Sequence, residues 1–72
     1  MTDSERLKKK IQDSGLLRVA ILRKLGIKSY ATLRAKVDGE SEFTVSEIDK
    51  LCKMLDIGRS EREAIFFAQG AE

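Results

Sequence analysis

The chain has 72 residues, of which 42% are hydrophobic and 36% charged, with one cysteine and no histidine. This composition excludes a disulfide framework and any metal site or catalytic dyad built on histidine. It also predicts a single domain, residues 1–72, with a core so small that stability should be modest.

The formal net charge of +2 is unevenly distributed along the chain. Residues 1 to 37 hold ten Lys or Arg against three acids, a net charge of +7, whereas residues 38 to 72 hold four against nine, a net charge of −5. A basic half suits nucleic acid, and an acidic half suits a basic protein surface. Both halves are also consistent with ordinary solvated helix faces.

The chain shows no sign of secretion or membrane insertion. Its N-terminal segment MTDSERLKKK has no apolar stretch of the kind that forms a signal peptide. No apolar run approaches the roughly 20 residues that a membrane-spanning helix needs. Because a chain without a cysteine pair also suits a reducing compartment, we expect a cytoplasmic protein without membrane contact.

The first predicted helix spans about residues 3 to 14 and carries a thin apolar stripe of Leu7 and Ile11. Thr2-x-x-Glu5 fits a capping box, in which the hydroxyl and the carboxylate each bond the other residue's backbone N–H. Glycine tolerates the left-handed conformation that ends a helix, so the five glycines mark expected boundaries. They stand at positions 15, 26, 39, 58 and 70.

Two further helices are predicted at about residues 17 to 25 and 29 to 38. A short turn with Gly26 separates them, and Ser29 is a suitable N-cap for the second. Two short helices joined by a glycine-containing turn are typical of a helix-turn-helix, here at about residues 16 to 38. Their expected core residues are Ile21, Leu22, Leu25, Leu33 and Val37.

The fourth predicted helix, about residues 45 to 56, has the clearest apolar face. Thr44-x-x-Glu47 fits a second capping box, and Phe43 and Ile48 have the spacing of a hydrophobic staple. The lone cysteine in this helix is expected to act as a small buried hydrophobe. The residues of this face are Val45, Ile48, Leu51, Cys52 and Leu55.

The fifth predicted helix spans about residues 61 to 69, with Ser60-x-x-Glu63 as a third capping box. Neighbouring helical side chains point about 100° apart, so either one of the Phe66 and Phe67 rings lacks core cover or both cap the core. No segment alternates in the way of a strand. The sequence therefore predicts an all-α fold, a compact bundle of about five short helices.

Catalysis is not expected. Without histidine the chain lacks the commonest general base, and no segment matches a phosphate-binding loop. Glu40 and Glu42 fall in a polar loop where we expect them to be solvated. A chain of this length also has little room for a substrate pocket. We therefore predict a binding protein rather than an enzyme, with no cofactor, no metal and no small-molecule substrate.

Several short groups of residues carry a resemblance to a known family: Thr32-Leu33, Lys36-Val-Asp-Gly39, Glu42-Phe-Thr-x-x-Glu-Ile48, Leu55 and Ile65-Phe-Phe67. In this order they resemble the Cro/repressor-type helix-turn-helix regulators of temperate phages of Gram-positive bacteria. The size and the near-neutral charge look most like the phage antirepressors called modulators of repression. The resemblance implies a lambda-repressor-like fold and action in the cytoplasm of a bacterial host.

The helix-turn-helix departs from the family pattern at three places. Leu17-Arg18 stand where the family usually has Thr-Gln, and Leu22 stands where it usually has a small residue. Residues 28 to 31 make the following segment one residue longer. We expect the larger Leu22 to splay the two helices and the extra residue to turn the third helix by about 100°. These changes disfavour ordinary docking in the DNA groove.

Two functional hypotheses follow. In the first, an antirepressor binds the helix-turn-helix domain of the phage repressor, and Asp38, Glu40 and Glu42 take the place of DNA phosphates. The alternative is a Cro-like repressor that binds operator DNA through residues 29 to 38, where Arg34 reads a guanine edge and lysines neutralise phosphates. The basic and polar contact candidates are Arg18, Lys28, Ser29, Tyr30, Thr32, Arg34 and Lys36, with Arg23 and Lys24 nearby.

Overall fold

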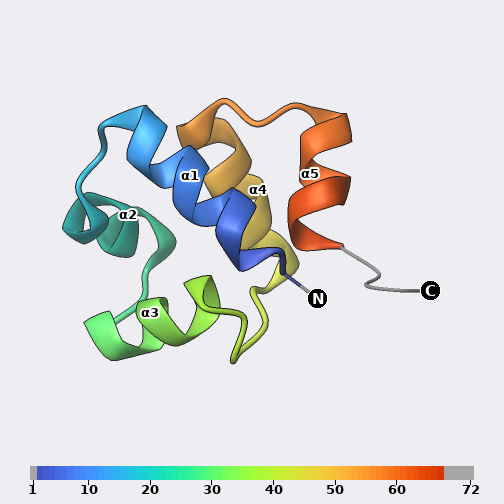
Figure 1. The fold of residues 1–72 in the computed structure, drawn as a ribbon. Coiled ribbons are helices and arrows are strands. Elements are labelled where there is room, and N and C mark those ends of the chain that lie inside the picture. The colour runs from blue at the N-terminus through green and yellow to red at the C-terminus, as the bar shows by residue number, and fades with distance from the viewer. Residues whose placement is uncertain (1, 68–72) are drawn as a thin grey trace.

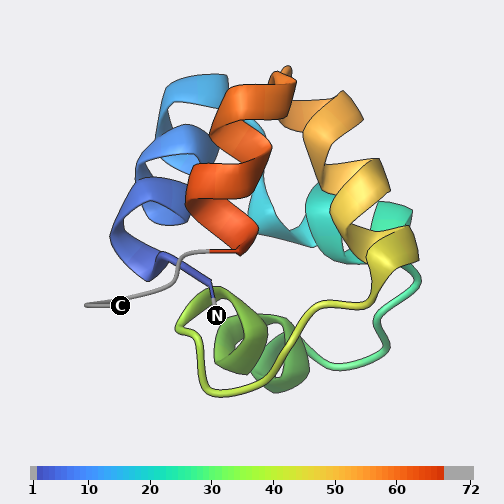
Figure 2. The same ribbon diagram turned by 90° about the vertical axis from the view of Figure 1, so that its right-hand side faces the viewer.

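The computed structural model describes residues 2–67, which form five helices and no strand, confirming the predicted all-α fold. Figure 1 shows α2 and α5 at opposite ends of the molecule, with α1 and α4 between them and α3 below. Turned by 90°, α1, α5 and α4 stand side by side above α3 (Figure 2). The helices are α1 Ser4–Ser14, α2 Arg18–Leu25, α3 Tyr30–Val37, α4 Val45–Leu55 and α5 Arg59–Phe66.

All five helices contribute to one hydrophobic cluster, which accounts for the compact arrangement. Each helix provides at least one side chain that is at most 2% exposed. The rings of Phe43 and Phe66 meet edge to face with their centroids 5.8 Å apart, which joins the segment before α4 to the end of α5. One such anchor from each helix, in chain order, is Leu7, Ile21, Leu33, Leu51 and Ile65.

The capping box predicted at the start of α4 is confirmed. Thr44 Oγ1 accepts a hydrogen bond from the Glu47 backbone N–H at 3.1 Å, and Glu47 Oε1 accepts one from the Thr44 N–H at 2.9 Å. Phe43 and Ile48, the predicted hydrophobic staple, are both buried in the common cluster. The start of this helix is therefore determined by residues next to it in the sequence.

The other two predicted capping boxes are wrong. Asp3 is the N-cap of α1, where its carboxylate accepts from the Arg6 N–H, because Thr2 is instead buried at 7% exposure. The Asp3 N–H donates to the Ile65 carbonyl oxygen at 2.6 Å, so this segment is held against α5. Helix α5 begins at Arg59 with Gly58 as its N-cap, which places Ser60 inside the first turn.

Three of the predicted glycine boundaries are confirmed, since Gly15, Gly26 and Gly39 have φ values of 74°, 75° and 83° at the ends of the first three helices. Gly58 also marks a helix boundary, but as the N-cap of α5 rather than as the residue that ends α4. Helix α4 ends instead at Asp56, which takes the left-handed conformation with a φ of 55°. The prediction at position 70 lies outside the described residues.

Two buried isoleucines were absent from the predicted core. Ile27 and Ile57 each follow a left-handed residue, and each donates its N–H to a carbonyl five residues earlier, those of Leu22 and Cys52. This is the Schellman arrangement, which turns the residue after the helix end back onto the helix. The bonds keep both connections close to the core, and the two side chains are each 8% exposed.

Three side chains at the edge of the core refine the sequence prediction. Val45 was expected on the buried face of α4 but is 67% exposed, because it is the first residue of the helix and lies beyond the neighbouring side chains. Cys52 is half-buried and packs against the core, as expected of a small hydrophobe. Phe66 is buried while Phe67 is 41% exposed, so the two adjacent rings have different surroundings.

Within the described part of the chain, no helix has both the length and the apolar character needed to cross a membrane.

Candidate interaction surface around α2 and α3

Helices α2 and α3 lie where the helix-turn-helix was predicted, joined by residues 26 to 29. Ile21 and Leu25 anchor α2 in the core, and Leu33 and Val37 anchor α3. Ser29 is the N-cap of α3 as expected, although its side chain makes no capping hydrogen bond. On each of the two helices, the face opposite these buried anchors is exposed to solvent.

Apolar side chains are exposed where the chain enters α2. Leu16, Leu17 and Val19 are 38%, 71% and 46% exposed, and Leu17 is the N-cap of the helix with no side-chain capping bond. We call Leu16, Leu17, Arg18 and Val19 the entry surface. Beside it lies an open depression of about 460 Å³, lined by Leu16, Leu17 and Arg18 of the entry surface and by residues of α1 that include Ile11. Three of the six large apolar side chains that are exposed among residues 2–67 belong to the entry surface.

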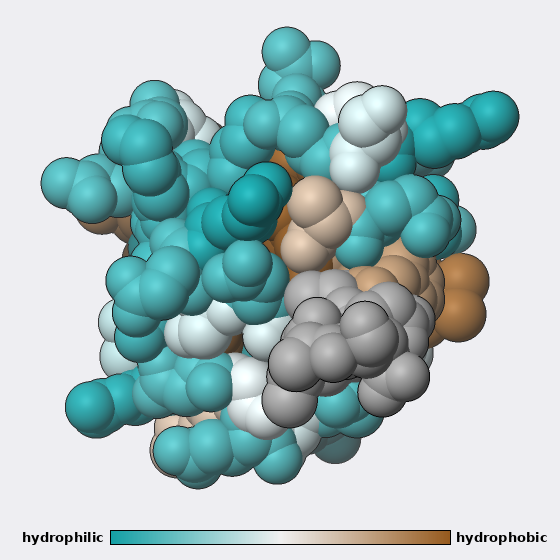
Figure 3. Space-filling view, turned by 45° about the vertical axis from the view of Figure 1, so that its right-hand side comes forward, coloured by the Kyte–Doolittle hydropathy of each residue, from teal (hydrophilic) through white to brown (hydrophobic). Residues whose placement is uncertain are grey.

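The face formed by α1 and α5 is different in character. Figure 3 shows it as mainly hydrophilic, with pale apolar areas between polar side chains and a brown apolar area at the right-hand edge of the view. Ion pairs span it, including Lys10–Glu61 at 2.6 Å and Lys9–Asp13 at 3.6 Å. Its charges are therefore largely matched within the chain, unlike the uncovered apolar side chains of the entry surface.

The larger Leu22 of the helix-turn-helix is accommodated at the edge of the core, where it is half-buried. Tyr30, at the start of α3, is 54% exposed. Arg18 is half-buried beside the depression. The remaining contact candidates that are exposed on α3 and the preceding turn are Lys28, Ser29, Thr32 and Arg34.

Lys36 occupies a different environment from the other candidates. Its Nζ donates to Glu47 Oε1 at 2.7 Å, and both side chains are only 14% exposed. Burial by itself would raise the pKa of the Glu47 carboxyl, but hydrogen bonds from Lys36 and the Thr44 backbone outweigh it, and the pKa lies below its ordinary value. The ammonium of Lys36 is thus held between α3 and α4, which disfavours its expected contact with a phosphate.

The three acidic candidates also differ. Asp38 is half-buried and lies 3.1 Å from Lys8 Nζ and 3.8 Å from Arg34 Nε. Glu40 and Glu42 are exposed in the loop between α3 and α4 and have no ion pair with any described residue. The acidic surface available to a partner consists of these two side chains rather than all three.

No protein-family model, curated protein or solved structure matches this chain.

Sequence reasoning had identified Leu17 only as a departure from a family pattern, and it did not identify Leu16 or Val19. Their exposure results from the short link between Gly15 and α2, which turns both leucines away from the core. The signal in the sequence was two leucines directly after a helix-ending glycine. Leu17 stands four residues before Ile21, at the spacing of one helical face, but it is the N-cap of α2 and lies before the first turn of that helix, where its side chain is exposed.

Proposed function

We propose that this protein is an antirepressor of the phage type, which binds the DNA-binding domain of a repressor and prevents it from holding its operator. The observation that carries the proposal is Leu17, which is 71% exposed at the N-cap of α2, the first helix of the helix-turn-helix. In DNA-binding versions of the motif, the first helix crosses the phosphate backbone. An exposed leucine gains nothing from a phosphate, whereas it gains from burial against a protein.

Charge supports the same proposal. A surface that binds DNA must be positive, because it neutralises phosphates. Glu40 and Glu42 are exposed, have no ion pair within residues 2–67 and are flanked by no lysine in their loop. They are suited to pair with the cations of such a surface, while the entry surface supplies apolar contact.

The direct test combines a phage repressor that has a helix-turn-helix DNA-binding domain, its labelled operator DNA, and this protein. The protein alone should give no operator-specific shift at moderate salt, and it should reduce repressor binding when the two are mixed. Sequence-specific, salt-dependent binding of the protein alone to the operator would contradict an antirepressor that acts without reading operator sequence.

Leu17→Glu should weaken association with the repressor by about tenfold, because about 1.4 kcal/mol of apolar contact is lost. Isothermal titration calorimetry with the purified repressor domain measures the effect. Val45→Glu is the matched control, since Val45 is 67% exposed but lies at the start of α4, outside the entry surface. Equal losses in both variants would contradict a specific role for the entry surface.

Reversing Glu40 and Glu42 to Lys should also weaken repressor association, by about tenfold, while circular dichroism of the protein stays the same. Both side chains are exposed in a loop, so no packing is lost. If association is unchanged, the acidic pair does not replace phosphates even where the two proteins do bind.

A second candidate function is Cro-like binding of operator DNA through α3. It is favoured by the exposed residues of α3 and of the turn before it, Lys28, Thr32 and Arg34, of which the Arg34 side chain is 74% exposed. Arg34→Gln should then abolish a specific operator complex of the protein alone and leave repressor association intact.

A further inference from the structure

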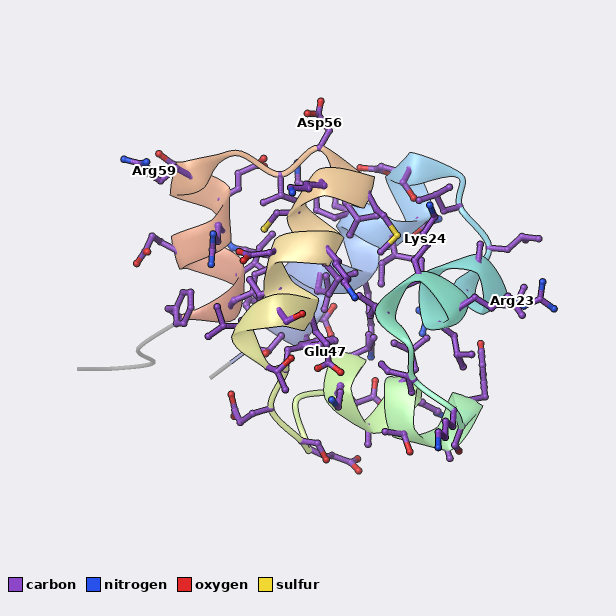
Figure 4. The ribbon with its side chains drawn as sticks, turned by 180° about the vertical axis from the view of Figure 1, so that it is seen from behind. Arg23, Lys24, Glu47, Asp56 and Arg59 are labelled. Atoms are coloured by element: carbon purple, nitrogen blue, oxygen red, sulfur yellow. The ribbon has the colours of Figure 1, made fainter. Side chains whose placement is uncertain are left out.

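Three lysines from two helices meet in one groove on the side of the molecule shown in Figure 4. Lys24 of α2 and Lys50 and Lys53 of α4 line an open groove of about 260 Å³, together with the half-buried Met54. Figure 4 places Lys24 between the two helices, whereas Arg23 points away from them. We call these three lysines and Met54 the lysine groove.

The charges of the lysine groove have no partner within residues 2–67. None of its three ammonium groups forms an ion pair, and no acidic residue lines it. The two acidic residues of α4 are occupied elsewhere, since Asp49 is 2.9 Å from Arg62 and Glu47 is paired with Lys36. The positive potential of the groove is therefore not cancelled by the chain itself.

Most other basic side chains of the structure are paired. Outside α2 and the lysine groove, carboxylates lie within 4.0 Å of seven Lys or Arg side chains: Arg6, Lys8, Lys9, Lys10, Arg34, Lys36 and Arg62. The concentration of unpaired charge between α2 and α4 is thus a local feature of the fold. It brings together residues that are 26 and 29 positions apart in the sequence.

We propose that the lysine groove binds phosphate groups of a nucleic-acid backbone, independently of base sequence. A lysine ammonium is a compact point charge with three donors, which suits a phosphate. Lysine is depleted in interfaces between proteins, so three of them around one groove favour a phosphate backbone over an acidic peptide. The groove offers no arginine fork and no amide side chain that would read a base edge.

This site is separate from the surfaces used in the proposed function. It includes no residue of the entry surface, none of the loop with Glu40 and Glu42, and none of α3. Contact with DNA through the lysine groove therefore leaves the entry surface available to a partner protein. The inference does not depend on which of the two candidate functions is correct.

The test uses the full chain and a fluorescently labelled duplex of arbitrary sequence, with binding followed by anisotropy at about 50 and 200 mM salt. Replacing Lys24, Lys50 and Lys53 with Gln should weaken binding at the lower salt concentration by at least tenfold. The slope of log affinity against log salt should fall by about 2 to 3, because each lost phosphate contact removes about 0.9.

The matched control removes three positive charges outside the lysine groove, by Arg6→Gln, Lys9→Gln and Arg59→Gln. These side chains are exposed, and Figure 4 shows Arg59 at the far end of the molecule from Lys24. This control should change affinity less than threefold. An equal loss in both triple variants would show that only net charge matters, and it would overturn the proposal.

Three other results would also overturn it. The first is no binding of the unmodified chain to the duplex at 50 mM salt. The second is loss of binding in a Lys28→Gln, Arg34→Gln variant but not in the lysine-groove variant, which would place the contact on α3. The third is displacement of the duplex by a free nucleoside triphosphate or a polyglutamate peptide at equal charge concentration, which would show that the groove selects isolated anions or acidic protein rather than a phosphate backbone.

Discussion

Replacing Leu33 with Ala should remove about 3 kcal/mol from the free energy of unfolding and leave a large fraction of the chain unfolded at 37 °C. Leu33 is 1% exposed and is the main anchor of α3, a helix whose start has no side-chain capping bond. Truncating a buried leucine loses its transfer free energy and leaves a cavity, at a cost of about 2 to 5 kcal/mol. A domain this small has only about 3 to 5 kcal/mol available from its core.

Urea unfolding followed by circular dichroism measures this effect. Leu17→Ala is the matched control, because it makes the same chemical change at a side chain that is 71% exposed. It should change the unfolding midpoint very little. A loss of less than about 1 kcal/mol for Leu33→Ala would show that burial in the common cluster is not what holds α3 in place.

Replacing Glu47 with Ala should cost about 2 to 3 kcal/mol, because this one carboxylate serves two contacts. It completes the capping box of α4 with Thr44, and it neutralises Lys36 of α3 at 2.7 Å. The Thr44 hydroxyl still caps the helix in this variant, but the Thr44 N–H loses its acceptor, at a cost of about 1 kcal/mol. Lys36 would also be left without its partner at 14% side-chain exposure, which adds to the loss.

Two further variants separate these contributions. Glu47→Gln keeps a side chain that can serve the capping box but loses the charge, so it should be milder than Glu47→Ala. Lys36→Met removes only the ion pair. If the pair is coupled as the geometry indicates, the double variant Lys36→Met, Glu47→Gln should lose less free energy of unfolding than the sum of the losses in the two single variants. Strict additivity would contradict the coupling.

The same carboxylate gives stability a defined pH dependence. Because the pKa of Glu47 is lower in the folded chain than its ordinary value of 4.5, its contribution is fully present above that value and is lost as pH falls through the folded pKa. The stability difference between the unmodified chain and Glu47→Gln should therefore shrink below about pH 4.5. A difference that stays constant down to pH 3 would contradict this assignment.

Local sequence patterns predicted the helices and most of the core, because they depend on residues close together in the chain. The Thr44 box and the left-handed glycines after the first three helices are of this kind. The predicted Thr2 box was wrong because the Asp3 N–H bonds the carbonyl oxygen of Ile65, 62 residues further along the chain. This contact with α5 fixes the position of the N-terminal segment. Ile27 and Ile57 were not predicted to be in the core because they follow the ends of α2 and α4, and the apolar repeat of a helix does not extend to residues beyond its end.

The candidate surface was predicted less completely, and for a related reason. The sequence grouped Lys36 with the other basic residues of its helix, since its partner Glu47 lies on the next helix and no spacing rule connects them. The same is true of Asp38, whose partner Lys8 belongs to α1. Which charges remain available to another molecule depends on pairing between helices, and that depends on the fold as a whole.

Cys52 provides the chain with its own reporter of local opening. It is the only cysteine, it lies half-buried on α4, and burial raises the pKa of its thiol. Since the thiolate is the reactive form, alkylation of the folded chain should be slow and should accelerate when α4 separates from its neighbours. Comparing the alkylation rate of the native chain with that in urea gives the free energy of that opening at a single known position. The opening of α4 can thus be measured in the native chain without an added label or a new cysteine.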